Sequence, residues 1–146
     1  MKQMIQRIRE EKSGFTLAEL LIVVAIVAVL VAIAIPVFSA QLAKANAGTD
    51  EANIRSGYAQ AQSFILTKMD NDKTKIASGD VYYLTTDAGL SKTGTKYETK
   101  GTSTDVDNVP GYLPAWTAQQ NVKYTFTVSA DTGEVTVAVE AVDKTK

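Results

Sequence analysis

The hydrophobic pattern is dominated by one uninterrupted apolar run close to the N-terminus. Residues 20–35 read LLIVVAIVAVLVAIAI and contain no charged or polar side chain. With Pro36, Val37 and Phe38 the uncharged run reaches nineteen residues. That is about the length a helix needs to cross a hydrocarbon core ~30 Å thick. Glu19 stands at the start of the run, where a carboxylate is costly and usually has a function. The pattern predicts a membrane-competent helix in which Glu19 needs an explanation.

Helical periodicity continues beyond the apolar run. Residues 39–69 are rich in alanine, glutamine, leucine and lysine and contain no proline. One apolar stripe recurs there at spacings of 4, 3, 4 and 4, and it consists of Ile54, Tyr58, Ala61, Ile65 and Met69. Such spacing is typical of an amphipathic helix with one buried face. The pattern predicts a helix that covers a sheet and ends at Asp70-Asn71-Asp72-Lys73.

Strict alternation of apolar and polar residues appears near the C-terminus. The apolar positions of two successive runs are Val122, Tyr124, Phe126 and Val128, then Val135, Val137, Val139 and Ala141. With the turn-rich residues 129–133 between them, these runs predict a β-hairpin with one buried face. The preceding segment 70–118 is polar and turn-rich, with one short strand candidate at Val81–Leu84. The whole pattern predicts an α+β fold, in which a long N-terminal α-helix packs on a small antiparallel β-sheet.

A short motif lies at the junction before the apolar run. Lys12-Ser13-Gly14 is followed by Phe15-Thr16-Leu17-Ala18-Glu19. This stretch resembles the processing site and mature N-terminus of type IV prepilins, most closely those of type IVa-like major pilins. In that family a prepilin peptidase cuts after the glycine and the next residue, usually Phe, is N-methylated. The fifth mature residue is a glutamate, and the twenty-second is often a proline.

The resemblance implies roles for four residues. Gly14 and Phe15 would form the leader cleavage and N-methylation site, Glu19 would set assembly and register, and Pro36 would kink the helix. Without a partner, a carboxylate in an apolar bundle is costly, so Glu19 would pair with the new amine of Phe15, either in its own subunit or in a neighbouring one. Because the proline removes a backbone hydrogen bond, it bends or loosens the helix in any case.

The resulting domain organisation has three parts. They are a prepilin leader peptide (1–14), a hydrophobic transmembrane and assembly helix (15–38) and a globular pilin head (39–146). Within the head we expect a helix (39–69), a variable loop on the filament surface (70–118) and an antiparallel sheet (119–146). An ordinary secretory signal would have its cleavage site after the apolar core instead. The alternative is an uncleaved anchor, with the basic residues of the N-terminus on the cytoplasmic side.

Composition excludes several kinds of chemistry. The chain has 146 residues, no cysteine and no histidine, which excludes Cys- or His-based catalytic triads and the usual zinc sites. No pair of carboxylates and no phosphate-binding loop stands out, so we expect no enzyme activity, no cofactor and no metal. Asp70-x-Asp72 and Asp105-x-Asp107 lack the glycine and glutamate of an EF-hand loop. Many type IV pilins of Gram-negative bacteria close a C-terminal loop with a disulfide. Within the resemblance, the lack of cysteine therefore favours the Gram-positive kind of pilin.

The expected partners follow from the resemblance. They are identical subunits in a helical filament, the prepilin peptidase, the assembly ATPase with its inner-membrane platform, and membrane lipid before assembly. The protein is expected in the cytoplasmic membrane as a single-pass precursor and then in an extracellular pilus. Lys92, Lys96 and Lys100 could touch DNA phosphates, but Glu98 dilutes their charge and a solvated face is favoured.

Three functions are compatible with the pattern. A structural subunit of a pilus for adhesion, motility or DNA uptake is the favoured function. A minor pilin or a pseudopilin of a type II secretion or competence system carries the same motif. The rival from another class is a membrane-anchored binding module that never polymerises.

Overall fold

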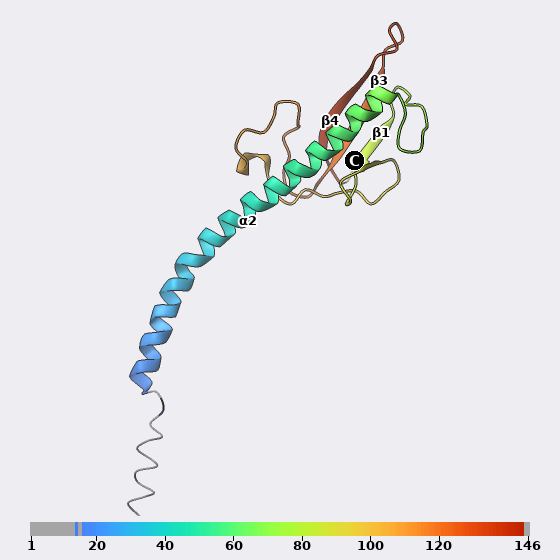
Figure 1. Cartoon of the computed structure of the whole chain (residues 1–146). Coiled ribbons are helices and arrows are strands. Elements are labelled where there is room, and N and C mark those ends of the chain that lie inside the picture. Colours follow the sequence, from blue (N-terminus) through green and yellow to red (C-terminus); the bar gives the residue numbers. More distant parts are fainter. Residues whose placement is uncertain (1–13, 15, 145–146) are drawn as a thin grey trace, which may run out of the picture. The chain divides into compact units, whose positions relative to one another are not determined.

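The computed structural model describes Gly14 and residues 16–144. It contains a helix α2 (Leu17–Thr67), strands β1 (Val81–Leu84), β2 (Leu90–Ser91), β3 (Gln120–Val128) and β4 (Val135–Asp143), and a short 3-10 helix η1 (Ser103–Asp105) (Figure 1). The predicted α+β class is confirmed. The chain divides into two compact units between Ala40 and Gln41, so that the second unit holds the C-terminal part of α2 and all four strands.

The helix α2 ends two residues before Met69, close to its predicted end. Lys68 adopts a left-handed backbone conformation, with φ 57°, which stops the helix. The Asp70 carboxylate then accepts hydrogen bonds from the backbone N–H groups of Asp72 (3.0 Å) and Thr74 (2.8 Å). An aspartate that bonds the backbone two residues on favours a turn over a continued helix. The polar stretch after Met69 therefore reverses the chain toward β1.

The four strands form one antiparallel sheet in the order β2-β1-β3-β4. The predicted hairpin is confirmed as β3 and β4, with Tyr124 opposite Val139 and Phe126 opposite Val137. The strand candidate at Val81–Leu84 is confirmed as β1, which pairs with β3. The two residues of β2 were not predicted, because so short a strand leaves no alternation to detect.

The C-terminal part of α2 covers the sheet with a stripe that differs from the predicted one. Its buried positions are Ala47, Asp50, Ile54, Gly57, Ala61 and Phe64. Of the predicted stripe, Ile54 and Ala61 are buried, Tyr58 and Ile65 are half-buried, and Met69 is exposed and outside the helix. The prediction was right for Ile54 and Ala61 but missed two buried positions, because it counted apolar residues only and those positions hold an aspartate and a glycine.

Gly57 lets the helix approach the sheet closely. A Cβ atom at this position would lie 2.5 Å from the Tyr124 hydroxyl oxygen and 3.1 Å from a methyl carbon of Leu84. The same Tyr124 hydroxyl donates a 2.6 Å hydrogen bond to the backbone carbonyl of Ile54. Burial of this hydroxyl raises the pKa of Tyr124 above its usual range. Helix and sheet are therefore joined by a tyrosine that fits only beside a residue without a side chain.

Asp50 fastens the segment before β3 to the helix. Its carboxylate is fully buried and accepts hydrogen bonds from the Tyr97 hydroxyl (2.7 Å) and the backbone N–H groups of Lys100 (2.8 Å) and Gly101 (2.7 Å). Burial, together with the bond to Asp50, raises the pKa of Tyr97 to about 12. A buried carboxylate is tolerated only when its oxygens are satisfied in this way. Asp50 is therefore a structural residue of the head.

The two helical glycines provide a matched test of this packing. We expect Gly57→Ala to destabilise the head by ~1–3 kcal/mol, because its methyl group would overlap the Tyr124 hydroxyl. Gly48 is exposed in the same helix and an added Cβ would meet nothing within 4 Å. Gly48→Ala should therefore stabilise the head by ~0.5–1 kcal/mol through helix propensity. Denaturant unfolding of the full chain in detergent measures both, and equal effects would contradict the close approach.

Candidate functional site

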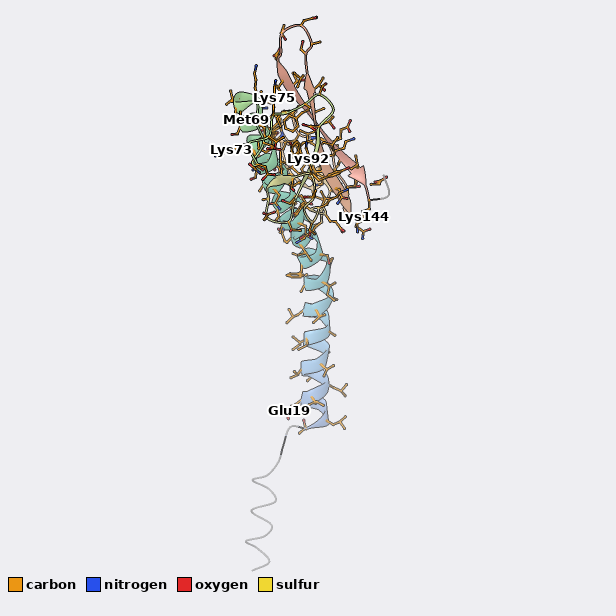
Figure 2. The ribbon with its side chains drawn as sticks, turned by 90° about the vertical axis from the view of Figure 1, so that its right-hand side faces the viewer. Glu19, Met69, Lys73, Lys75, Lys92 and Lys144 are labelled. Atoms are coloured by element: carbon orange, nitrogen blue, oxygen red, sulfur yellow. The ribbon has the colours of Figure 1, made fainter. Side chains whose placement is uncertain are left out.

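The N-terminal part of α2 exposes an almost continuous apolar surface. Every residue from Leu17 to Ala40 is exposed, and the large apolar ones include Leu21, Val24 and Ile35 at about 60% of their full exposure. Figure 2 shows side chains that extend to both sides of the ribbon along this part of α2, which starts near the labelled Glu19. The helix is long and apolar enough, by length and composition, to cross a membrane. So large an apolar surface indicates contact with lipid or with other protein chains.

Gly14 lies directly before this helix. It is exposed and not helical, and a Cβ atom added there would meet no heavy atom within 4 Å. Phe15, the other residue of the expected cleavage and methylation site, lies outside the described residues. Among the described residues, therefore, none restricts the size of a side chain at position 14.

Glu19 and Thr16 cap the helix reciprocally. The Glu19 carboxylate accepts hydrogen bonds from the Thr16 backbone N–H (2.7 Å) and the Thr16 hydroxyl (2.9 Å). The Thr16 hydroxyl oxygen in turn accepts the backbone N–H of Glu19 (3.2 Å). The Thr16 carbonyl also accepts the first helical bond, from Leu20 at 3.1 Å. This arrangement is a capping box, in which a threonine and a glutamate three residues later satisfy each other's backbone N–H groups.

The capping box gives Glu19 a role that the sequence analysis did not recognise. The first N–H groups of a helix have no partner within it, and in an apolar environment water cannot supply one. Thr16 and Glu19 supply partners from the chain itself. The sequence signal for this motif is Thr-x-x-Glu directly before an apolar run. The expected role of Glu19 in register is a separate prediction that this geometry leaves open.

Pro36 lies inside α2 and does not end it. Its missing N–H leaves the Ala32 carbonyl without its usual helical donor, and its ring crowds that carbonyl. Three residues later the Ser39 hydroxyl donates a 3.0 Å bond back to the carbonyl of Ile35. Bonds of this kind weaken the helical ladder locally. Two adjacent perturbations therefore coincide at Pro36, the position where a kink is expected.

The acidic turn after α2 shows no geometry of a metal site. Within the described residues, no group of three or more carboxylates is arranged to hold a metal ion. The second Asp70 oxygen accepts the Tyr82 hydroxyl at 2.9 Å, so both oxygens have structural partners. Partial burial acts to raise the pKa of Asp70, but hydrogen bonds from Thr74 and Tyr82 outweigh it and lower that pKa. The turn aspartate therefore shapes the chain.

A polar groove of about 800 Å³ lies between this turn and β2. Its polar groups also bond one another. Gln60 accepts the backbone N–H of Leu90 at 2.5 Å and donates to Asn71 at 3.1 Å. These bonds tie helix, turn and strand together.

Two of the three lysines considered for DNA contact, at positions 92, 96 and 100, make contacts within the chain. The Lys92 ammonium pairs with Asp80 at 2.8 Å, and this bond raises the pKa of Lys92. The Lys96 ammonium lies 3.6 Å from the centre of the Tyr83 ring. Two of the three lysines thus have intramolecular partners, which favours the solvated-face interpretation over contact with DNA.

One comparison with known proteins gives a match. The model of the prokaryotic N-terminal methylation motif matches residues 11–35, a stretch that includes Gly14, Thr16 and Glu19. No curated protein and no solved structure matches the chain. This match, which covers 25 of the 146 residues, supports a type IV pilin-like or pseudopilin-like protein with a prepilin-type N-terminus, and the family that the motif defines is structural. It also implies a prepilin peptidase and an assembly machinery as partners.

The capping box can be tested by removing the Thr16 hydroxyl. In Thr16→Val the Glu19 N–H loses its acceptor and the Glu19 carboxylate loses one donor. Loss of such a cap costs ~1 kcal/mol, so amide hydrogen exchange in the first turn of α2 should accelerate several-fold in the detergent-bound chain. Thr16→Ser keeps the hydroxyl and should exchange like the wild type. Unchanged exchange in Thr16→Val would show that the cap does not hold the helix start.

Proposed function

We propose that the chain is the structural subunit of a type IV pilus, most like a major pilin of the type IVa kind. In this proposal a prepilin peptidase cuts after Gly14, the new N-terminal residue Phe15 is methylated, and the subunit polymerises through its N-terminal helix into a surface filament. The observation that carries the proposal is continuity: the methylation motif at residues 11–35 runs directly into a helix that is apolar on every side.

The apolar helix supports the proposal because it suits two environments. Before assembly the leader would remain in the cytoplasm, with the helix in the lipid of the cytoplasmic membrane. After cleavage the helices would leave the lipid and pack against one another as the filament core. Apolar side chains have a similar free energy in contact with lipid tails and with other apolar helices. The hydrophobic effect therefore neither strongly opposes nor strongly favours the transfer of the helix from lipid to the filament core. The assembly ATPase and its membrane platform would supply the motor work.

Glu19 has two compatible roles in this proposal. Its carboxylate offers about four acceptor positions, so it can keep both bonds from Thr16 and still accept an ammonium group. Cleavage creates that ammonium on Phe15. Pairing between the amine of one subunit and Glu19 of a shifted neighbour would select one axial register, which apolar packing alone defines loosely.

A minor pilin or a pseudopilin of a secretion or competence system is the second candidate, because the same motif occurs there. A membrane-anchored module that never polymerises is the third. Recovery of the protein as the bulk component of sheared surface filaments would favour the major pilin over both.

Two substitutions of Glu19 separate capping from charge pairing. Glu19→Gln keeps a capping-box partner for Thr16 but removes the charge, whereas Glu19→Ala removes both. If Glu19 sets register by pairing with the amine, both variants should insert normally in the membrane and yield at least 10-fold fewer filaments. Quantification of sheared filaments against the membrane pool gives the readout. Wild-type filament yield from Glu19→Gln would leave the residue only its capping role.

The cleavage site is tested by Gly14→Val. An added Cβ atom meets no heavy atom of the described residues within 4 Å, so the precursor should accumulate in the membrane with a normally folded head. Cleavage should fall by more than 10-fold because the peptidase must approach the backbone closely at this position. Mass spectrometry of the N-terminus measures the outcome. A mature N-terminus at Phe15 in this variant would refute the assignment.

A further inference from the structure

The sheet has two very different edges. On one side it ends in β2, which has two residues, and on the other in β4, which has nine. An exposed edge strand presents unpaired N–H and C=O groups and invites another strand, so natural proteins shorten it or protect it with lysine or proline. The β2 edge is short. The β4 edge is long, and the segment Val135–Asp143 contains neither lysine nor proline.

The register identifies which backbone groups of β4 point outward. In an antiparallel pair only alternate residues exchange hydrogen bonds with a given neighbour. Phe126 of β3 bonds toward β1, since its N–H donates to Asp80 (2.9 Å) and its carbonyl accepts from Gly79 (2.8 Å). The alternate residues of β3 therefore bond to β4, and their partners there are Thr136, Ala138 and Glu140. Val137, Val139 and Ala141 consequently direct their N–H and C=O groups away from the sheet.

These outward groups have no partner within residues 16–144. The backbone hydrogen bonds of the loops and turns include none to Val137, Val139 or Ala141. One of the two carboxylates of the strand is neutralised from β3, because Lys123 pairs with Glu140 at 2.8 Å, and the other, Asp143 at the end of the strand, accepts a hydrogen bond from Gln120 at 3.1 Å. The side chains of the three outward residues are apolar and only half-buried. The edge is thus open within the described residues, has no unpaired charge between Val135 and Val142, and is flanked by apolar surface.

The strand is complementary to itself in one antiparallel register. Only residues whose N–H and C=O groups point outward can bond across the two edges. The allowed registers between two copies of β4 therefore differ from one another by shifts of two residues. With Val139 opposite Val139, all nine residues pair and each Glu140 lies opposite Ala138. A register centred on Glu140 would oppose two like charges, which destabilises a cross-strand pair. A register centred on Ala138 would pair only residues 135–141 and lose the end of the strand.

We propose that β4 is a homotypic docking edge, through which the heads of two copies of this chain join their sheets by antiparallel β4–β4 pairing centred on Val139. Such a contact is isologous, with the same surface on both partners. Successive subunits of a helical filament meet through heterologous contacts instead. The β4 pair therefore links subunits of two different filaments, or two subunits outside a filament. The lateral joining of filaments rests on the proposed function, whereas the pairing itself does not.

The chain has no cysteine, so single cysteines report the pairing directly. In the proposed register two Val139 residues face each other within disulfide range, whereas two Thr136 residues are six positions apart, about 20 Å. Full-length Val139→Cys should form a disulfide-linked dimer under mild oxidation at least 10-fold faster than Thr136→Cys. The measurement is a non-reducing gel of detergent-solubilised chain and of sheared material. Equal rates for the two variants would overturn the register and the proposal.

A second substitution guards against chance collisions. Val137→Pro removes an outward N–H and keeps every β3–β4 bond, so in the Val139→Cys background the head should stay folded and cross-linking should fall to the Thr136→Cys level. Persistent cross-linking would overturn the proposal. Cross-linking of solubilised chain without any filaments would support the pairing and count against the pilus function. Filaments without cross-linking of the folded Val139→Cys chain would support the pilus function and count against the pairing.

Discussion

The first half of α2 presents apolar side chains on every side, and no described part of its own unit covers them. This constraint organises the rest of the molecule. An amphipathic helix can satisfy its apolar face with one sheet, but an all-round apolar helix needs surroundings that are apolar on all sides. Lipid and a bundle of identical helices are two such surroundings. The methylation motif at residues 11–35 precedes and overlaps that surface. Processing of the N-terminus and assembly would therefore involve the same part of the chain.

The start of this helix has a second need, because an apolar environment offers no water to its first N–H groups. Thr16 and Glu19 meet that need within four residues of sequence. The carboxylate is consequently held in place before any partner arrives. A charged group that is already oriented loses less freedom when it pairs, so capping and pairing with an amine reinforce each other.

The second half of the same helix has the opposite character. Its contact with the sheet depends on positions where side chains are small or hydrogen-bonded. Gly57 admits the ring of Tyr124, and Asp50 holds three donors from the segment 97–101. Nearby, Gly101 lies so close to Ala47 that a Cβ atom would be 2.5 Å from the Ala47 backbone nitrogen. The head is thus held to its helix by a few close approaches that tolerate little change in volume.

The sequence by itself determined the elements whose signal is local. The α+β class, the β3–β4 hairpin and the short strand β1 follow from hydrophobic patterns within continuous stretches of sequence, and the structure confirms them. The capping box was equally local and was overlooked. Only the tertiary structure decided that Asp50 and Gly57 belong to the buried stripe, since their burial depends on Tyr97, Lys100 and Tyr124, some 45 to 70 positions away. The strand order was likewise undecided, because which strand becomes an open edge depends on pairing between distant segments and leaves no periodic mark in any one of them.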